Sequence, residues 1–226
     1  MSIPVRRDRL GVGAILWTWD GEVSESLSAR VLQVYRRWKN DPVLSASGLL
    51  DVVPAYTSVA IHFEPVSGKA EQIIAHAESL LRETETAAPE QQRDQQQDHE
   101  TSEPTRKVEI PVCYNGPDLS RVATHCGITA ADVIRRHTAA RYTVAMIGFR
   151  PHFPYLIGMD PSLAVPRLDE PRTAVPAGSV GIAGIQTGVY PVTSPGGWNI
   201  IGSCDPQLLT TLQPGDRLMF RSASCG

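Results

Sequence analysis

Glycine and proline are concentrated in the second half of the sequence. The last 79 residues hold 11 of the 18 glycines and 10 of the 18 prolines. Glycine tolerates positive φ, and proline fixes φ while lacking a backbone donor, so both residues favour tight turns. The densest part, from Gly148 to Trp198, therefore predicts short strands joined by sharp corners, which suits a compact β-barrel or a sandwich.

Five short strands are expected in this half, near Ala174 and over residues 180–183, 188–191, 198–202 and 217–220. The turn-forming segments VPAG, SPGG and QPGD lie between these strands. Closing such strands into a barrel removes their exposed edges. We therefore predict a barrel domain over residues 148–226.

The first half of the sequence alternates strand and helix patterns. Residues 13–19 are rich in strand formers, and apolar residues recur at helical spacing over 27–38 and 70–81. Ser24 or Ser26 is the N-cap candidate of the first helix. Residues 49–56 and 58–64 predict a hairpin between the helices. A strand over 106–114 would complete a βαββαβ order, so we predict a ferredoxin-like α+β domain.

Residues 83–106 are polar, charged and rich in glutamine. A segment with so little apolar surface cannot offset the entropy cost of ordering it, so we expect a disordered insertion within the first domain. After it, residues 118–126 and 129–137 predict two short helices, the second opened by the capping box of Thr129 and Asp132. A strand over 141–149 follows. We assign residues 1–147 to the first domain and 148–226 to the barrel of an α+β protein.

Composition excludes several classes of function. No apolar run approaches the roughly 20 residues of a membrane helix, and the N-terminus has no signal-peptide pattern, so we expect a cytoplasmic protein without a membrane partner. The net charge of −3, without a basic patch interleaved with aromatic residues, argues against nucleic acid. The four cysteines form no CxxC pair, so neither a metal site nor a disulfide is expected.

The sequence contains no complete catalytic motif, since GxGxxG, GxxxxGK[ST], GxSxG and HExxH do not occur in it. Candidate groups therefore have to be sought among polar residues on the turns. Arg167 and Arg172 flank an acidic loop, and two arginines on constrained loops suit bidentate capture of a carboxylate or phosphate. The alternative is structural ion pairing with Asp169, Glu170 or Asp160.

The segment QTGVY contains side chains that can hydrogen-bond to a cyclic amide. Gln186, Thr187 and Tyr190 offer both donors and acceptors, which a lactam requires, although the same groups could instead satisfy turn backbone. Phe153 and Tyr155 are expected to form an apolar wall, either of a pocket or of the core.

His137 is the candidate proton carrier, because the charge of a histidine changes near neutral pH. It ends the helix predicted over 129–137, so the alternative role is that of a cation stabilised by the helix dipole. The predicted catalytic residues are His137, Arg172 and Gln186. The predicted substrate-binding residues are Phe153, Tyr155, Arg167, Thr187 and Tyr190.

Several segments of the sequence resemble those of a known family. They are GFRPHFPYLIGMDPSLAVPR, PRTAVPAGSVGIAGIQTGVYPVTSPGGWNIIG and, more weakly, VEIPVCY, RRHTA and LQPGDRLMF. With them the chain resembles the KipI-like family, which includes the B subunit of ATP-dependent 5-oxoprolinase and the allophanate hydrolase subunit 1 domain. The sequence departs from the family at His152, Ile157 and Ile185, where glycine is usual. Its segment 202–213 is also shorter than usual.

The resemblance implies a cyclophilin-like barrel for the second domain. It also implies cleavage of 5-oxo-L-proline to L-glutamate, with ATP as co-substrate and with subunits C and A as partners. Because the sequence has no phosphate-binding loop of its own, we expect the chain to be inactive alone. Two alternatives stay open: an inhibitor that binds a sensor histidine kinase, and a subunit related to allophanate hydrolase or urea carboxylase.

Overall fold

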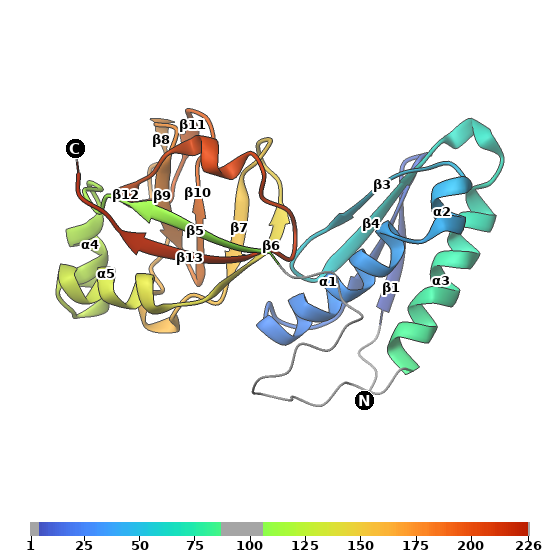
Figure 1. Ribbon diagram of the computed structural model, residues 1–226, viewed down its shortest axis with the longest axis horizontal. Helices are drawn as coiled ribbons and strands as arrows, with labels where there is room; N and C mark the ends of the chain where they lie inside the picture. Colours follow the sequence, from blue (N-terminus) through green and yellow to red (C-terminus); the bar gives the residue numbers. More distant parts are fainter. Residues whose placement is uncertain (1–4, 87–105, 226) are drawn as a thin grey trace. The chain divides into compact units, whose positions relative to one another are not determined.

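The computed structural model describes residues 5–86 and 106–225 (Figure 1). The chain divides into two compact units, Met1–Glu103 and Pro104–Gly226. The first contains a four-stranded sheet with helices, and the second contains a seven-stranded sheet that is nearly closed into a barrel. The predicted mixture of α and β structure is confirmed.

The first unit is an antiparallel sheet with helices packed on one face (Figure 1). Its sheet order is β1-β2-β4-β3. The elements are β1 (Val5–Leu10), β2 (Ala14–Trp19), α1 (Glu25–Lys39), α2 (Pro42–Ala46), β3 (Leu49–Pro54), β4 (Ser58–Phe63), the short 3-10 helix η1 (Pro65–Ser67) and α3 (Ala70–Thr86).

The core of this unit forms where the apolar faces of α1 and α3 meet the sheet. Trp17 of β2 and Trp38 of α1 contact each other edge to face with ring centroids 4.8 Å apart. The indole of Trp38 donates to the backbone oxygen of Ala77, so this buried polar group is satisfied. Ser24, one of the two N-cap candidates, accepts from the backbone N–H of Leu27 and caps α1.

The fourth strand of this sheet is not the predicted one. The strand expected over 106–114 was assigned to complete a βαββαβ order, but the edge position beside β2 is occupied by β1. A tight turn at residues 11–13, with Gly11 at φ +64°, folds β1 back onto β2 as a hairpin from Val5↔Trp19 to Leu10↔Ala14. Because a hairpin closes the shortest loop, the N-terminal strand takes the edge at the lowest entropy cost.

The first residues of the predicted insertion belong to a helix. Residues 83–86, expected to be disordered, continue α3 to Thr86. Glu85 explains the extra turn, since its carboxylate accepts from Arg30 Nη2 at 2.6 Å and from the indole of Trp19 at 3.3 Å. At its other end Arg106, also expected to be disordered, donates through Nη2 to the carboxylate of Asp216 at 2.7 Å. Residues 87–105 of the predicted insertion lie outside the described residues.

The second unit is built on a sheet of order β12-β9-β10-β7-β6-β13-β5, with a separate ribbon of β8 and β11. Its elements are β5 (Lys107–Val112), α4 (Leu119–Cys126), α5 (Ala130–Ala139), β6 (Tyr142–Ile147), β7 (Pro154–Ile157), η2 (Pro161–Leu163), β8 (Arg172–Val175), β9 (Ser179–Ala183), β10 (Gln186–Val189), β11 (Ser194–Gly196), β12 (Asn199–Ser203), η3 (Pro206–Leu209) and β13 (Arg217–Ser222).

The two outer strands of this sheet meet at their ends, which nearly closes the barrel. Cys113, directly after β5, exchanges two backbone hydrogen bonds with Ser203 at the end of β12. Helices α4 and α5 pack against β12 and β13 respectively (Figure 1). All five strands predicted in this half are present, with ends shifted by a few residues.

The boundary between the units differs from the predicted one at 147/148. Strand β5 pairs in parallel with β13, and β6 lies between β7 and β13, so residues from Pro104 onward belong to the second unit. Glycine and proline density marked where turns are frequent. This density did not indicate that β5, which precedes the dense region, belongs to the barrel.

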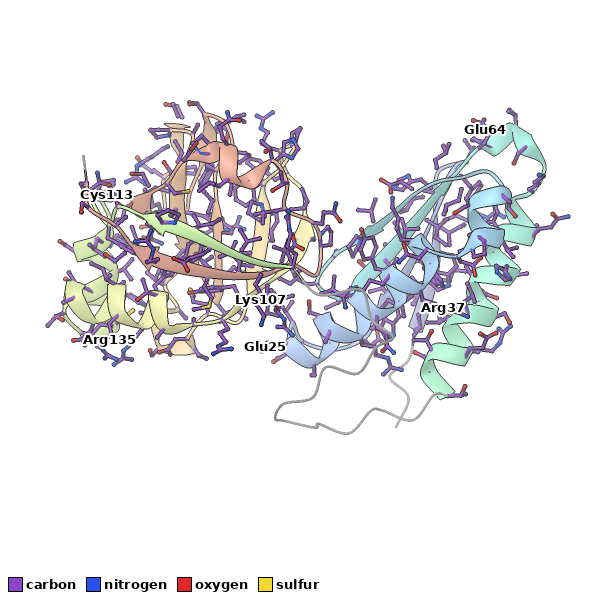
Figure 2. All side chains as sticks on the ribbon, viewed as in Figure 1. Glu25, Arg37, Glu64, Lys107, Cys113 and Arg135 are labelled. Carbon is purple, nitrogen blue, oxygen red and sulfur yellow. A yellow bond between two sulfur atoms is a disulfide. The ribbon has the colours of Figure 1, made fainter. Side chains whose placement is uncertain are left out.

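Cys113 and Cys225 form a disulfide, contrary to the expectation from the scattered cysteines. Cys113, labelled in Figure 2, directly follows β5, and Cys225 follows β13, the parallel neighbour of β5. Parallel pairing brings the two strand ends to the same edge, which spacing along the sequence cannot reveal. Cys126 and Cys204 are free.

Among residues 5–86 and 106–225, no helix is both long enough and apolar enough to cross a bilayer.

Candidate functional site

Four aromatic side chains gather on one face of the seven-stranded sheet and are called the aromatic cluster below. The ring centroid of Phe153 lies 4.8 Å from that of Tyr155, 5.2 Å from that of Tyr190 and 5.6 Å from that of Trp198. Phe153, Tyr190 and Trp198 are buried, and Tyr155 is half-buried. The cluster therefore forms an apolar wall of which Tyr155 is the one partly accessible member.

Two glycines on neighbouring strands make room for these rings. A Cβ atom at Gly188 of β10 would lie 3.1 Å from both Phe153 Cε1 and Trp198 Cζ3. At Gly181 of β9 it would lie 3.1 Å from the Cβ of Trp198. The glycines thus provide a flat strand surface on which aromatic rings can lie, a purpose separate from turn formation.

The ribbon of β8 and β11 covers the aromatic cluster. Val175 of β8 belongs to the same buried group of side chains, and Gly196 of β11 lies against the Tyr190 ring, where any side chain would collide with the phenol. Ser194 of β11 is buried, and its hydroxyl has no hydrogen-bond partner among the described residues. The cover is therefore apolar next to the rings but also carries a polar group with free hydrogen-bonding capacity.

Arg172, at the start of β8, presents a guanidinium beside the aromatic cluster. Its Nη2 donates to the carboxylate of Asp118 at 2.8 Å. Its Nη1 is buried and has no hydrogen-bond partner within the described part of the chain. The predicted alternative partners of the arginines were Asp169, Glu170 and Asp160, so this ion pair with Asp118 is a correction.

Arg167 lies on the exposed loop before β8, and its charge reaches the same rings. Burial raises the pKa of the Tyr155 and Tyr190 phenols, and the positive charge of Arg167 opposes that rise. The loop is held in place because the backbone N–H of Leu168 donates to the Gly197 oxygen at 2.7 Å. Both predicted arginines are therefore brought to the aromatic cluster.

The predicted pair of Gln186 and Thr187 is separated by the alternation of strand β10. Gln186 is directly opposite Ala183, so it shares the face of the aromatic cluster with Gly188 and Tyr190. Thr187 points to the opposite face, into the barrel interior, and is fully buried. Gln186 therefore stays a candidate for substrate contact, whereas Thr187 lies behind the sheet.

Thr187 belongs to a buried hydrogen-bond chain with His137. The Thr187 hydroxyl donates to the Gly181 oxygen at 2.9 Å, so its oxygen accepts from His137 Nε2–H at 3.1 Å. His137 Nδ1 is then the acceptor for the Tyr114 hydroxyl at 2.8 Å. The geometry assigns the neutral tautomer of the histidine, with both ring nitrogens satisfied.

This environment argues against the predicted role of His137 as a proton carrier. The ring is fully buried and stacks on Phe220 with centroids 4.6 Å apart. Burial lowers the pKa of His137 to about 3, so the imidazole is neutral at physiological pH. His137 also cannot act as a cation at the helix end. Its role in this structure is to join α5 to the barrel.

Two buried polar residues of the second unit were not singled out from the sequence. The helical pattern marked Asp118 only as the first residue of a helix. Asn199 is fully buried: its Nδ2 donates to the oxygens of Pro166 and Ile182, and its Oδ1 accepts from Arg121 Nε at 2.9 Å. No local pattern marks the role of either residue, because their partners are distant along the chain.

Among the described residues, no three His, Cys, Asp or Glu side chains come together as metal ligands would. The chemistry that this arrangement supports is recognition. An apolar wall, two guanidinium groups, an amide and a phenol can together bind a compact anion that has a flat ring.

Comparison with known families gives a match over residues 5–216 to the carboxyltransferase domain, subdomain C and D. The chain is 36% identical over 233 residues to the B subunit of 5-oxoprolinase from Bacillus subtilis (strain 168), covering 97% of this chain and 93% of that protein. It is 33% identical over 221 residues to the B subunit of 5-oxoprolinase from Escherichia coli O157:H7, covering 93% of both.

Solved structures are similar as well. The crystal structure of TTHA0988 matches with a TM-score of 0.75 and 33% identity over 95% of this chain, and this chain spans 40% of that one. The urea amidolyase of K. lactis matches with a TM-score of 0.71 over 99% of this chain and 15% of that enzyme. At 18% identity, the second likeness concerns the fold alone.

Proposed function

Because this chain belongs to the carboxyltransferase-domain family, subdomain C and D, and within it to the B subunits of 5-oxoprolinase, we propose that its aromatic cluster binds 5-oxo-L-proline. The chain is the B subunit of a 5-oxoprolinase complex. In this proposal it helps cleave the cyclic amide to L-glutamate.

The observation that carries the proposed binding site is the buried Nη1 of Arg172, which lacks an acceptor among the described residues. A buried donor without a partner costs roughly 1–3 kcal/mol, so an anionic ligand gains affinity by satisfying it. 5-oxo-L-proline carries one carboxylate for Arg172 and a small five-membered ring for the aromatic cluster. Its charge would also be attracted by Arg167.

The lactam amide of the substrate requires one acceptor and one donor. Gln186 lies on the face of the aromatic cluster and supplies both groups from one side chain. The half-buried phenol of Tyr155 is a second donor. These residues would hold the ring in one orientation.

We extend the proposal to the assembly. The sequence has no phosphate-binding loop, so ATP, the proposed co-substrate, would be bound by another chain. Subunits C and A are the proposed partners that complete the site. We also propose a ferredoxin-like class for the first unit, with its fourth strand taken from the N-terminus, and a cyclophilin-like class for the barrel of the second unit.

The proposed cellular location is the cytoplasm, as the sequence suggested. Disulfides rarely persist in the reducing cytosol, so the Cys113–Cys225 bond makes this location worth testing directly. Alkylation of the free thiols in freshly lysed cells, followed by mass spectrometry, reports whether this pair is oxidised in the cell.

The test of the function is reconstitution. The chain is purified alone and with subunits C and A of its own organism, and L-glutamate formation from 5-oxo-L-proline is followed with and without ATP. We expect turnover only from the full set with ATP. Turnover by the isolated chain would contradict the shared-site account. Failure of the full set, combined with tight binding of the chain to a sensor histidine kinase, would favour the inhibitor alternative.

A further inference from the structure

Asp118 stands directly before α4, where an aspartate usually caps a helix. Its side chain makes no hydrogen bond to the backbone of α4. Thr129 at the start of α5 does cap its helix, by accepting from the backbone N–H of Asp132 at 3.1 Å. Helix α4 thus forgoes a stabilisation of about 1 kcal/mol that capping typically contributes, so the carboxylate of Asp118 is committed elsewhere.

Both oxygens of Asp118 are held. Oδ2 accepts from the backbone N–H of Ile200 at 2.7 Å, and Oδ1 accepts from Arg172 Nη2 at 2.8 Å. The backbone N–H of Asp118 also donates to the Ile200 oxygen at 2.9 Å. With 6% of its surface exposed, Asp118 has one available orientation, fixed by strand β12.

The segment before Asp118 is shaped for this contact. A Cβ atom at Gly116 would collide with the backbone of Ile200 and Ile201, so only glycine lets the chain approach β12 this closely. The N–H of Gly116 donates to the Ile201 oxygen at 3.2 Å. The start of α4 is therefore docked on β12, and the carboxylate projects from a rigid base.

We propose that Asp118 is a positioning residue that orients Arg172 so that its Nη1 edge binds the carboxylate of a small cyclic amide substrate. The inference rests on the proposed function and names the residue on which recognition of the substrate's charge depends. Asp118 binds one edge of the planar guanidinium and thereby determines where the other edge points. Asp118 balances the charge of Arg172, and the incoming carboxylate is balanced by Arg167 nearby.

The site can be tested by binding, without turnover. The probes are 5-oxo-L-proline and 2-pyrrolidone, which has the same lactam ring but no carboxylate. Their affinities are measured by titration calorimetry for the complex with subunits C and A, in the absence of ATP. Asp118→Asn keeps the size of the side chain but removes the charge that holds Arg172. The matched control is Asp132→Asn, which breaks an exposed aspartate–arginine pair at the start of the other helix.

We expect Asp118→Asn to weaken binding of 5-oxo-L-proline about tenfold, equivalent to about 1.4 kcal/mol, and to leave binding of 2-pyrrolidone within about twofold. Asp132→Asn should change neither affinity. If Asp118 had a purely structural role, Asp118→Asn would weaken binding of both probes to the same extent. This result, or unchanged affinity for both probes, would overturn the inference.

Two further outcomes are informative. If Asp118→Asn does not fold, Asp118→Glu replaces it in the same experiment, since it keeps the charge but displaces the guanidinium; a loss confined to 5-oxo-L-proline is again expected. If the wild-type complex binds neither probe, the proposed function fails and this inference fails with it. If the wild type binds 5-oxo-L-proline but the variants do so equally well, only the role of Asp118 is refuted.

Discussion

The buried histidine of the barrel makes the stability of the second unit depend on pH in a defined direction. His137 is neutral in the folded protein, with a pKa of about 3, whereas an unfolded histidine has a pKa near 6.5. Between these values the unfolded chain binds more protons than the folded one. The free energy of unfolding contributed by His137 is therefore fully present above pH 6.5 and is lost as pH falls toward 3.

The size of the effect follows from the linkage relation. Lowering the pH from about 7.5 to about 5.0 protonates His137 in the unfolded chain only, which should cost the second unit about 2 kcal/mol. His137→Gln retains a side chain that can donate and accept but cannot titrate. The free energy of unfolding of the variant at about pH 7.5 should differ from that of the wild type. Its decrease between about pH 7.5 and 5.0 should be about 2 kcal/mol smaller than in the wild type.

Hydrogen exchange measured by mass spectrometry can determine the pH dependence of the free energy of unfolding for the second unit alone. Peptides from β10 and β13 report opening of the second unit, and their opening free energies are compared at about pH 7.5 and 5.0 after correction for the intrinsic exchange rate. His125→Gln, on the exposed surface of α4, is the matched control and should retain the wild-type dependence. If His137→Gln also retains it in full, the buried neutral histidine is not the cause.

Four other changes test separate parts of the structure. Arg172→Lys keeps the charge but loses the planar guanidinium, so turnover of the assembled enzyme should fall about tenfold or more with folding intact; full activity would count against Arg172. Cys225→Ser should lower the free energy of unfolding of the second unit by about 2–4 kcal/mol, and dithiothreitol should have no further effect on this variant. Glu85→Gln should cost about 1–2 kcal/mol in urea unfolding, because its charged bond to Arg30 is lost. Replacing residues 87–105 by a short Gly/Ser linker should cost less than about 1 kcal/mol, and a larger loss would contradict the slow dependence of loop closure on length.

The identity of most helices and strands was available from local patterns. Apolar residues at helical spacing predicted the two long helices of the first unit, and the capping residue Ser24 marked the start of one of them. The capping box at Thr129 marked α5. The Gly/Pro turns marked the short strands of the second half. These signals are local because helix periodicity, capping and turn formation each depend on residues within a few positions of one another.

The partners of the strands were not available in that way. A strand over 106–114 fits the first sheet by its pattern as well as it fits the barrel, but the hairpin of β1 and β2 fills the edge of the first sheet. The same limit applies to the insertion, since the Glu85 carboxylate gains Arg30 and Trp19 only after α1 and β2 have packed beside α3. Competition between distant segments determined these pairings.

Three rings of the aromatic cluster and the two arginines were proposed as site residues from the sequence, because side-chain chemistry on turns can be recognised locally, whereas Trp198 was not among them. Their surroundings were decided by the tertiary structure. The sheet separates Gln186 from its neighbour Thr187, and burial removes the charge of His137. Asp118 and Arg172 are 54 residues apart and meet in the folded chain, where the backbone N–H of Ile200 of β12 also holds the carboxylate. Sequence determines which groups are present, whereas the desolvation and orientation that give each group its role depend on contacts that exist only in the folded chain.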